Sequence, residues 1–161
     1  MPNRAYSPKC STCRQRTMAL SSMPYSVKIN LDGREYEVDI PSLIVPMCSN
    51  CKAFVLDDEA NNDIDRAFRQ HASLLTPEEI RSGREKLGLN QQAFAQCFGI
   101  AVSTLSRWET GSQIQQRFHD GILRAFFAMP DLRTFLAKLH GVLYATNGVS
   151  ATISMPVSAP P

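Results

Sequence analysis

The chain has 161 residues, of which 43% are apolar and 20% charged, and its formal net charge is +2. This balance is typical of a soluble globular protein and excludes a polycationic nucleic-acid coat, so any DNA binding must depend on local patches. No apolar run approaches the ~20 residues that span a bilayer, and residues 1–9 lack the apolar core of a signal peptide. We therefore expect a cytoplasmic protein that makes no use of a membrane.

Two segments near the N-terminus alternate between apolar and polar residues. They are Tyr25–Leu31 and Arg34–Ile40, and the dipeptide Asp32-Gly33 between them is typical of a hairpin turn. The pattern predicts a β-hairpin. Pro41 and Pro46 are expected to break the chain after it, because proline cannot donate to a strand ladder.

Paired cysteines flank the predicted hairpin, Cys10-x-x-Cys13 before it and Cys48-x-x-Cys51 after it. Four thiolates form the closed tetrahedral set that structural Zn²⁺ prefers, and they leave no open position for a hydrolytic centre. About fifty residues with one hairpin bury too little apolar surface to fold alone, so a metal that joins both ends would stabilise them. We predict one structural Zn²⁺ and a zinc-binding domain over residues 10–56.

A redox role for the two Cys-x-x-Cys pairs is the alternative, but neither pair lies in the strand–helix pattern that redox motifs have. The fifth cysteine, Cys97, is expected to be a small buried apolar residue. A zinc-dependent enzyme would need an open metal position and a paired acid and base, and the sequence offers neither. We therefore expect no enzymatic activity.

Residues 57–75 begin with an acidic stretch and are expected to form a linker that can adopt a short helix. A helix start follows, with Thr76 as N-cap, Pro77 at the first helical position and Glu79 completing a capping box. Five helices are predicted after the linker, over residues 77–87, 91–98, between Gly99 and Gly111, 117–129 and 130–141.

The predicted fold class is two small domains. The N-terminal one is a β-hairpin domain held together by zinc (α+β, mostly β), and the C-terminal one, over residues 76–145, is all-α. Residues 1–9 and 146–161 are expected to be disordered, because neither segment shows an apolar period.

The short helix between Gly99 and Gly111 has two distinct faces. Glycine can take the positive φ that a sharp corner before the helix and a stop after it require. The residues predicted for a buried stripe are Val102, Leu105 and Trp108. The residues on the other face are Ser103, Ser106 and Arg107, with Ala101 and Thr104 at its edges. A small polar face with one charge suits a helix in a DNA major groove; an ordinary solvated helix is the alternative.

Residues 89–95 and 99–111 resemble, nearly position by position, the Cro/repressor-type (XRE-family) helix–turn–helix. The resemblance implies a compact five-helix domain that binds a palindromic operator as a homodimer. It implies that Gln91 grips a backbone phosphate and that Arg84 and Glu109 pair to tie the first helix of this domain to the third. It also implies a set of DNA-contacting residues on the recognition helix: Ala101, Val102 (partly committed to packing), Ser103, Thr104 and Arg107.

Two Cys-x-x-Cys pairs around a hairpin, followed by this helix–turn–helix, resemble the MqsA/YgiT family of antitoxins over about residues 10–140. The resemblance implies a type II antitoxin whose N-terminal domain binds an mRNA-cleaving toxin and whose C-terminal domain represses its own operon. The family's usual asparagine is Ser103 here, although Arg107 matches, and Lys52 replaces a frequent glycine. The alternative is a stand-alone zinc-containing helix–turn–helix transcription factor without a toxin partner.

Overall fold

The computed structural model describes residues 8–142. Contacts within the chain divide it into two compact units, which we call unit 1 (Met1–Ser73) and unit 2 (Leu74–Pro161). No helix in the described range is both long and apolar enough to cross a membrane. The disorder expected for the tail at 146–161 and for residues 1–7 falls outside this range.

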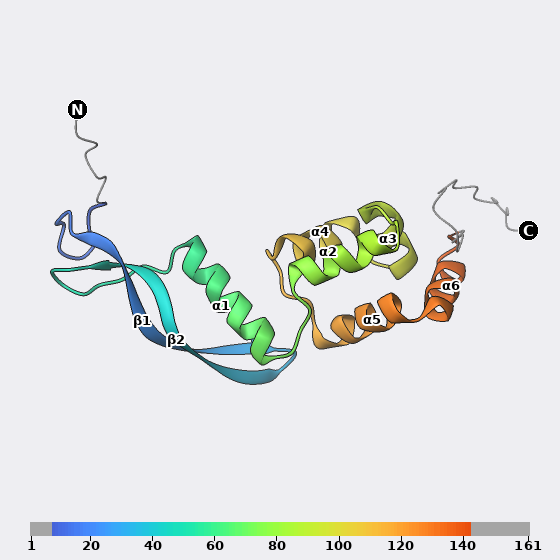
Figure 1. Ribbon diagram of the computed structural model, residues 1–161, viewed down its shortest axis with the longest axis horizontal. Coiled ribbons are helices and arrows are strands. Elements are labelled where there is room, and N and C mark those ends of the chain that lie inside the picture. Colours follow the sequence, from blue (N-terminus) through green and yellow to red (C-terminus); the bar gives the residue numbers. More distant parts are fainter. Residues whose placement is uncertain (1–7, 143–161) are drawn as a thin grey trace, which may run out of the picture. The chain divides into compact units, whose positions relative to one another are not determined.

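Unit 1 is built on an antiparallel hairpin of β1 (Met18–Leu31) and β2 (Arg34–Cys48) (Figure 1). The two-residue turn has positive φ at Asp32 (53°) and Gly33 (76°), which is the conformation that the right-handed twist of a hairpin favours. The predicted hairpin is present, and both strands are longer than predicted, since β1 begins at Met18 and β2 ends at Cys48.

The predicted break at the two prolines is wrong, because β2 continues through both of them to Cys48. The pairing skips between Met23/Leu43 and Tyr25/Ile40, so that Pro41 lies in a bulge where no ladder bond is needed. Pro46 pairs with Leu20, and its carbonyl accepts a hydrogen bond from the backbone N–H of Val55 at 3.0 Å. The prolines therefore bend the hairpin without ending it.

The expected linker contains a helix, α1 (Asp58–His71), which packs on β2. Asp57 caps it by accepting from the N–H of Ala60 at 2.9 Å. Ile64 joins the buried cluster of the hairpin, and the Phe68 ring meets the Tyr36 ring edge-on with 5.4 Å between centroids. The described residues thus hold six helices, one more than the five predicted, and the additional one covers a face of the hairpin.

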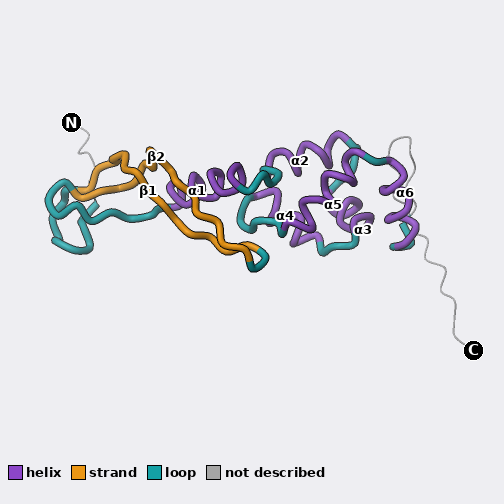
Figure 2. The backbone as a smooth tube through the Cα atoms, turned by 90° about the horizontal axis from the view of Figure 1, so that it is seen from below, coloured by secondary structure: helices purple, strands orange, loops and turns teal. Residues whose placement is uncertain are grey.

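Unit 2 is all-α over its described part, as the purple tube in Figure 2 shows. Its helices are α2 (Pro77–Lys86), α3 (Gln91–Phe98), α4 (Val102–Thr110), α5 (Arg117–Ala128) and α6 (Pro130–Leu139). Thr76 and Glu79 form the predicted capping box at the start of α2. The Phe94 ring lies at the centre of the core, 5.0 Å from the Phe126 ring and 5.5 Å from the Phe98 ring.

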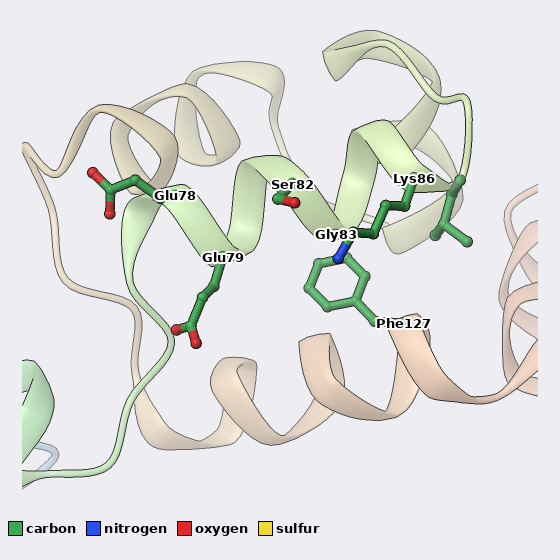
Figure 3. Close-up of a pocket in the computed structure, with 7 residues that line it drawn as sticks. Glu78, Glu79, Ser82, Gly83, Lys86 and Phe127 are labelled. Carbon is green, nitrogen blue, oxygen red and sulfur yellow. The ribbon is translucent and has the colours of Figure 1, made fainter.

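A close contact joins α2 to α5. A Cβ added at Gly83 would lie 2.7 Å from the Phe127 ring, so only glycine lets the ring approach this far. Figure 3 shows the ring against the helix, beside a hollow whose other lining residues are Glu78, Glu79, Ser82, Lys86 and Leu87. None of the predicted site residues lines this hollow.

Candidate functional site

The structure brings the four predicted metal ligands together at the end of the hairpin away from its turn. Their sulfur atoms all lie within 4.8 Å of one another, with 3.6 Å between Cys10 and Cys51 and 3.6 Å between Cys13 and Cys48. Four sulfurs at 2.3 Å from one tetrahedral zinc would be about 3.8 Å apart, whereas a disulfide needs about 2.05 Å. The cluster can therefore hold a single metal ion and is consistent with zinc. Cys97 is buried in unit 2 and takes no part.

Both Cys-x-x-Cys pairs fold into the same tight turn. The backbone N–H of Arg14 donates to the carbonyl of Cys10, and that of Lys52 donates to the carbonyl of Cys48, each at 3.0 Å. The residue after each pair has a left-handed φ, 63° at Arg14 and 62° at Lys52. The turn thus forms at Lys52 without the glycine that this position favours, at a cost of roughly 1–2 kcal/mol.

The first cysteine of each pair is set up to ionise. The backbone N–H of Cys51 and the hydroxyl of Thr17, 3.0 Å from the sulfur, lower the pKa of Cys48 to about 6. The backbone N–H of Cys13 likewise lowers the pKa of Cys10. Thr17 was not identified from the sequence, because nothing in the sequence indicates that it lies next to a cysteine 31 residues away.

The last thiol of the cluster resists ionisation. The backbone N–H of Ala53 lowers the pKa of Cys51, but desolvation and hydrogen bonds with Cys10, Cys48 and Cys13 outweigh it and raise the pKa to about 11. Four thiolates this close repel one another unless a cation neutralises them, and a bound metal deprotonates its thiol ligands. The chemistry of this donor set therefore fits a metal ion.

A buried ion pair joins α2 to α4 in unit 2. Arg84 Nε donates to Glu109 Oε1 at 2.6 Å and Arg84 Nη2 to Glu109 Oε2 at 3.0 Å, and the two side chains are 9% and 2% exposed. Arg84 also donates to the Leu89 carbonyl at 2.8 Å, and Gln91 Nε2 donates to Glu109 Oε2 at 2.9 Å. The three helices α2, α3 and α4 thus meet on one carboxylate.

The same contacts keep the pair charged. Burial alone would raise the pKa of Glu109, but the hydrogen bonds from Arg84 and Gln91 lower it below its usual value. The hydrogen bond to Glu109 raises the pKa of Arg84. Gln91, which the resemblance assigned to a phosphate, uses one of its two amide hydrogens in this network, and the second remains for another acceptor.

The helix α4 lies between two glycines with positive φ, Gly99 at 84° and Gly111 at 79°. Leu105 and Trp108 are buried, as predicted. The expectation that Val102 belongs to the same buried stripe is wrong, since its side chain is 39% exposed at the first residue of the helix. The buried residues that anchor α4 therefore begin at Leu105, one turn after its start.

The predicted DNA-contacting residues of α4 are mostly open to solvent. Ala101, Ser103 and Arg107 are exposed, and Thr104 is half-buried. The Arg107 carbonyl accepts from the Gln113 N–H at 3.2 Å, which holds the chain after α4 against the helix end. Ala101 is the N-cap and supplies no side-chain hydrogen bond, so the first amides of α4 are not capped by a side chain.

The corner between α3 and α4 is backed by the residue after α6. His140 Nδ1 lies 3.1 Å from the Cys97 carbonyl, which can only accept, so the proton of neutral His140 is placed on Nδ1. A Cβ added at Gly99 would lie 2.4 Å from Cε1 of the same ring. Glycine is therefore needed at position 99 for two reasons, the positive φ and the close approach of the His140 ring.

A second buried polar network, which no pattern in the sequence indicated, holds the chain before α2 against the rest of unit 2. The N–H of Leu75 donates to Asp120 Oδ1 at 2.7 Å, and Gln115 Nε2 donates to the Leu75 carbonyl at 2.7 Å. Arg124 Nε donates to Asp120 Oδ2 at 2.7 Å. Only the Asp120–Arg124 spacing of four residues is visible in the sequence, and it indicates a surface pair rather than this contact.

The chain matches a known protein family over most of its length. Residues 8–133 match the family described as the antitoxin component of a bacterial toxin–antitoxin system, MqsA. The chain belongs to the MqsA antitoxin family. The match includes all four clustered cysteines and ends within α6. A comparison with curated proteins gave no match. The antitoxin role and a toxin as partner follow from the family.

We expect Glu109→Gln to reduce the free energy of unfolding of unit 2 by about 3–5 kcal/mol at pH 7, because it leaves the Arg84 charge buried without a counterion. The lowered pKa of Glu109 stabilises the fold above about pH 4.3, the usual value of an unfolded glutamate. That stabilisation is lost as the pH falls through the native pKa, so the difference from the wild type should narrow there. Urea unfolding of both proteins, at pH 7 and at a pH below the native pKa of Glu109, measures this difference.

Glu85→Gln is the matched control, since Glu85 Oε1 lies 3.5 Å from the same Arg84 but is 57% exposed. It should cost at most about 1 kcal/mol. Equal losses for the two variants would contradict a special role of the buried pair.

We expect Gly99→Ala to destabilise unit 2 more than Gly111→Ala. Both positions have a positive φ, which costs an alanine roughly 1–2 kcal/mol, but a Cβ at Gly111 would meet only Pro77 Cγ, at 3.4 Å. The difference in melting temperature therefore reports the clash with His140. Adding His140→Ala should raise the melting temperature of Gly99→Ala and leave that of Gly111→Ala unchanged. If it does not raise the melting temperature of Gly99→Ala, the His140 ring does not press on position 99.

Proposed function

We propose that this antitoxin is a sequence-specific DNA-binding repressor that autoregulates its operon and neutralises an mRNA-cleaving toxin. The observation that carries the DNA-binding part is α4 itself. One side of the helix is held by Leu105, Trp108 and the buried Glu109, while Ser103 and Arg107 lie exposed one turn apart. A rigidly anchored helix with a small polar outer face is the form that a major groove accepts.

Direct readout rests mainly on Arg107. A guanidinium can donate two hydrogen bonds to guanine O6 and N7, which contributes ~1–3 kcal/mol of discrimination. Val102 stands exposed on the same helix and offers an apolar contact for a thymine methyl group. Gln91, with one amide hydrogen left, and the uncapped first amides of α4 are suited to backbone phosphates.

One arginine in each recognition helix is little for specific binding, so the proposal includes a homodimer on a palindromic operator with half-sites about one helical turn apart. The exposure of the apolar residues of unit 2 indicates which of them could form the dimer interface. Phe126 is fully buried in the core, whereas Phe135 and Leu139 are 60% and 64% exposed on α6. The two lie four residues apart on one helix face, as an isologous contact between α6 helices requires.

The metal of unit 1 is proposed to be one structural Zn²⁺, bound by Cys10, Cys13, Cys48 and Cys51. Zinc favours four thiolates in a closed tetrahedron, and such a site supplies folding energy rather than chemistry. Unit 1, which comprises the hairpin and α1, is the part proposed to bind the toxin. A transcription factor without a toxin partner is the second candidate. The two candidates differ in whether the adjacent reading frame encodes a small ribonuclease-like toxin.

We expect the purified chain to contain one zinc, and Cys48→Ala to abolish it. A strong chelator should unfold unit 1 and leave the helices of unit 2 folded, because only unit 1 contains the cluster. Metal analysis and hydrogen exchange measure the two effects. Cys97→Ala is the control, and its zinc content should equal that of the wild type. Retention of the hairpin's slow-exchanging amides after chelation would refute a structural metal.

We expect Arg107→Ala to abolish specific binding to the protein's own promoter without a change in melting temperature. Arg107→Lys should restore the charge but not the bidentate contact, so it should recover nonspecific binding and little specificity. Arg81→Ala, at a 63% exposed position on α2, is the control. A mobility-shift assay with specific and scrambled duplexes measures all three variants. If Arg107→Lys kept full specificity, Arg107 would contact a phosphate and not a base.

A further inference from the structure

The outer edge of β1 has no strand beside it in the described part of the chain. Within residues 8–142 the sheet has two strands, and the one further pairing is a bridge between Met47 of β2 and Phe54. That bridge lies along the far side of β2. Over residues 25–31, β1 therefore presents an unpaired row of backbone groups, and such an edge is a template for another strand.

The side chains of β1 are also less covered than those of β2. On the inner face, where α1 packs, Ile40 of β2 is half-buried and the other apolar residues of the strand are 0–5% exposed; they are Tyr36, Val38, Leu43 and Val45. Their neighbours on β1 are only half-buried; they are Met23, Tyr25, Val27 and Ile29. The cause is the position of α1, which lies on β2 (Figure 1). An apolar row is thus left half-exposed beside the open edge.

The register shows which backbone groups of β1 face outward. Leu31 and Arg34 flank a two-residue turn and therefore form a hydrogen-bonded pair, and such pairs alternate along an antiparallel ladder. It follows that Ser26, Lys28 and Asn30 direct their N–H and C=O groups away from β2. Their side chains lie on the outer face of the hairpin, opposite to the apolar row.

The turn half of the hairpin carries an excess of negative charge, which comes from β2 and the turn, because Lys28 is the one charged residue of β1. Residues 25–40 carry four carboxylates and two cationic side chains, and the carboxylates of Asp39 and Glu35 hydrogen-bond to Ser26 and Lys28 of β1. A basic partner is therefore attracted to the edge. A second copy of the chain would bring the same excess of carboxylates to it and be repelled.

We propose that the outer edge of β1 binds an edge strand of the toxin, which extends the hairpin to a three-stranded sheet. The inference rests on the proposed toxin-neutralising function and names the surface that performs it. The incoming strand hydrogen-bonds to Ser26, Lys28 and Asn30 and lays alternate apolar side chains over Val27 and Ile29. It belongs to a basic protein, since an mRNA-cleaving toxin uses cationic side chains to bind RNA phosphates and these favour a surface with excess carboxylates.

The test is a calorimetric titration of the full-length antitoxin with the protein encoded by the adjacent reading frame. Lys28→Pro removes one outward N–H and leaves the ladder to β2 intact, and it should weaken binding at least about tenfold. Glu37→Pro is the matched control, because Glu37 pairs with Lys28 in the register and faces the other edge. It should leave the affinity within about twofold. Lys28→Ala isolates the loss of charge and should not weaken binding to a basic partner.

Two further measurements make the outcome independent of any folding defect in Lys28→Pro. In the wild-type complex, the amides of Ser26, Lys28 and Asn30 should exchange with solvent at least about tenfold more slowly than in the free antitoxin. The melting temperature and operator binding of both proline variants should match the wild type.

Each alternative result is informative. If the wild type does not bind the adjacent protein at all, the proposed toxin-neutralising function fails and the inference fails with it. If the wild type binds while Lys28→Pro has no effect and the three amides stay unprotected, the edge is not the docking surface. A change in the sedimentation of free Lys28→Pro would show that the edge pairs with a second copy, which also overturns the inference.

Discussion

The thiol cluster is the contact that joins the two ends of unit 1, since its cysteines connect the chain before β1 to the chain after β2. The buried apolar residues between β2 and α1 are few; they are Tyr36, Val38, Leu43 and Val45 on the strand and Ala60, Ile64 and Phe68 on the helix. The two turns that present the sulfurs place residues in left-handed conformations at Arg14 and Lys52, so the cluster is set up at some local cost. Such strain persists only where the surroundings determine the geometry, and a metal ion would do so.

Unit 2 is organised by a different constraint, a single buried carboxylate. Glu109 belongs to α4, yet it accepts from Arg84 of α2 and from Gln91 of α3. A buried ion pair of this kind is weak evidence for stability in itself, since desolvation offsets much of the attraction, but it defines one relative orientation of the helices. Together with the Gly99 corner and the His140 ring against it, the pair determines the direction in which Ser103 and Arg107 face.

The two units leave different surfaces open, and the difference suits two partners. Unit 2 presents a small polar helix face with one cation, and unit 1 presents a strand edge beside the carboxylates of β2. In the proposed function the first surface binds DNA and the second binds a basic protein. The half-buried row on β1 is what distinguishes this edge from an ordinary solvated strand, because apolar area without cover is expected where a partner binds.

Local chemistry in the sequence was enough to predict much of this protein. The Asp32-Gly33 turn, the Thr76 capping box and the glycines at 99 and 111 each act within a few residues, so they could be identified without a fold. Each Cys-x-x-Cys turn is local in the same way, and the preference of one metal ion for four thiolates predicted that the two turns come together. Tertiary structure alone decided that β2 passes through Pro41 and Pro46, that Val102 faces solvent, and that α1 packs mainly on β2. Each of these depends on which residues lie opposite one another across the fold, and burial and backbone pairing between distant segments are not encoded in any local pattern.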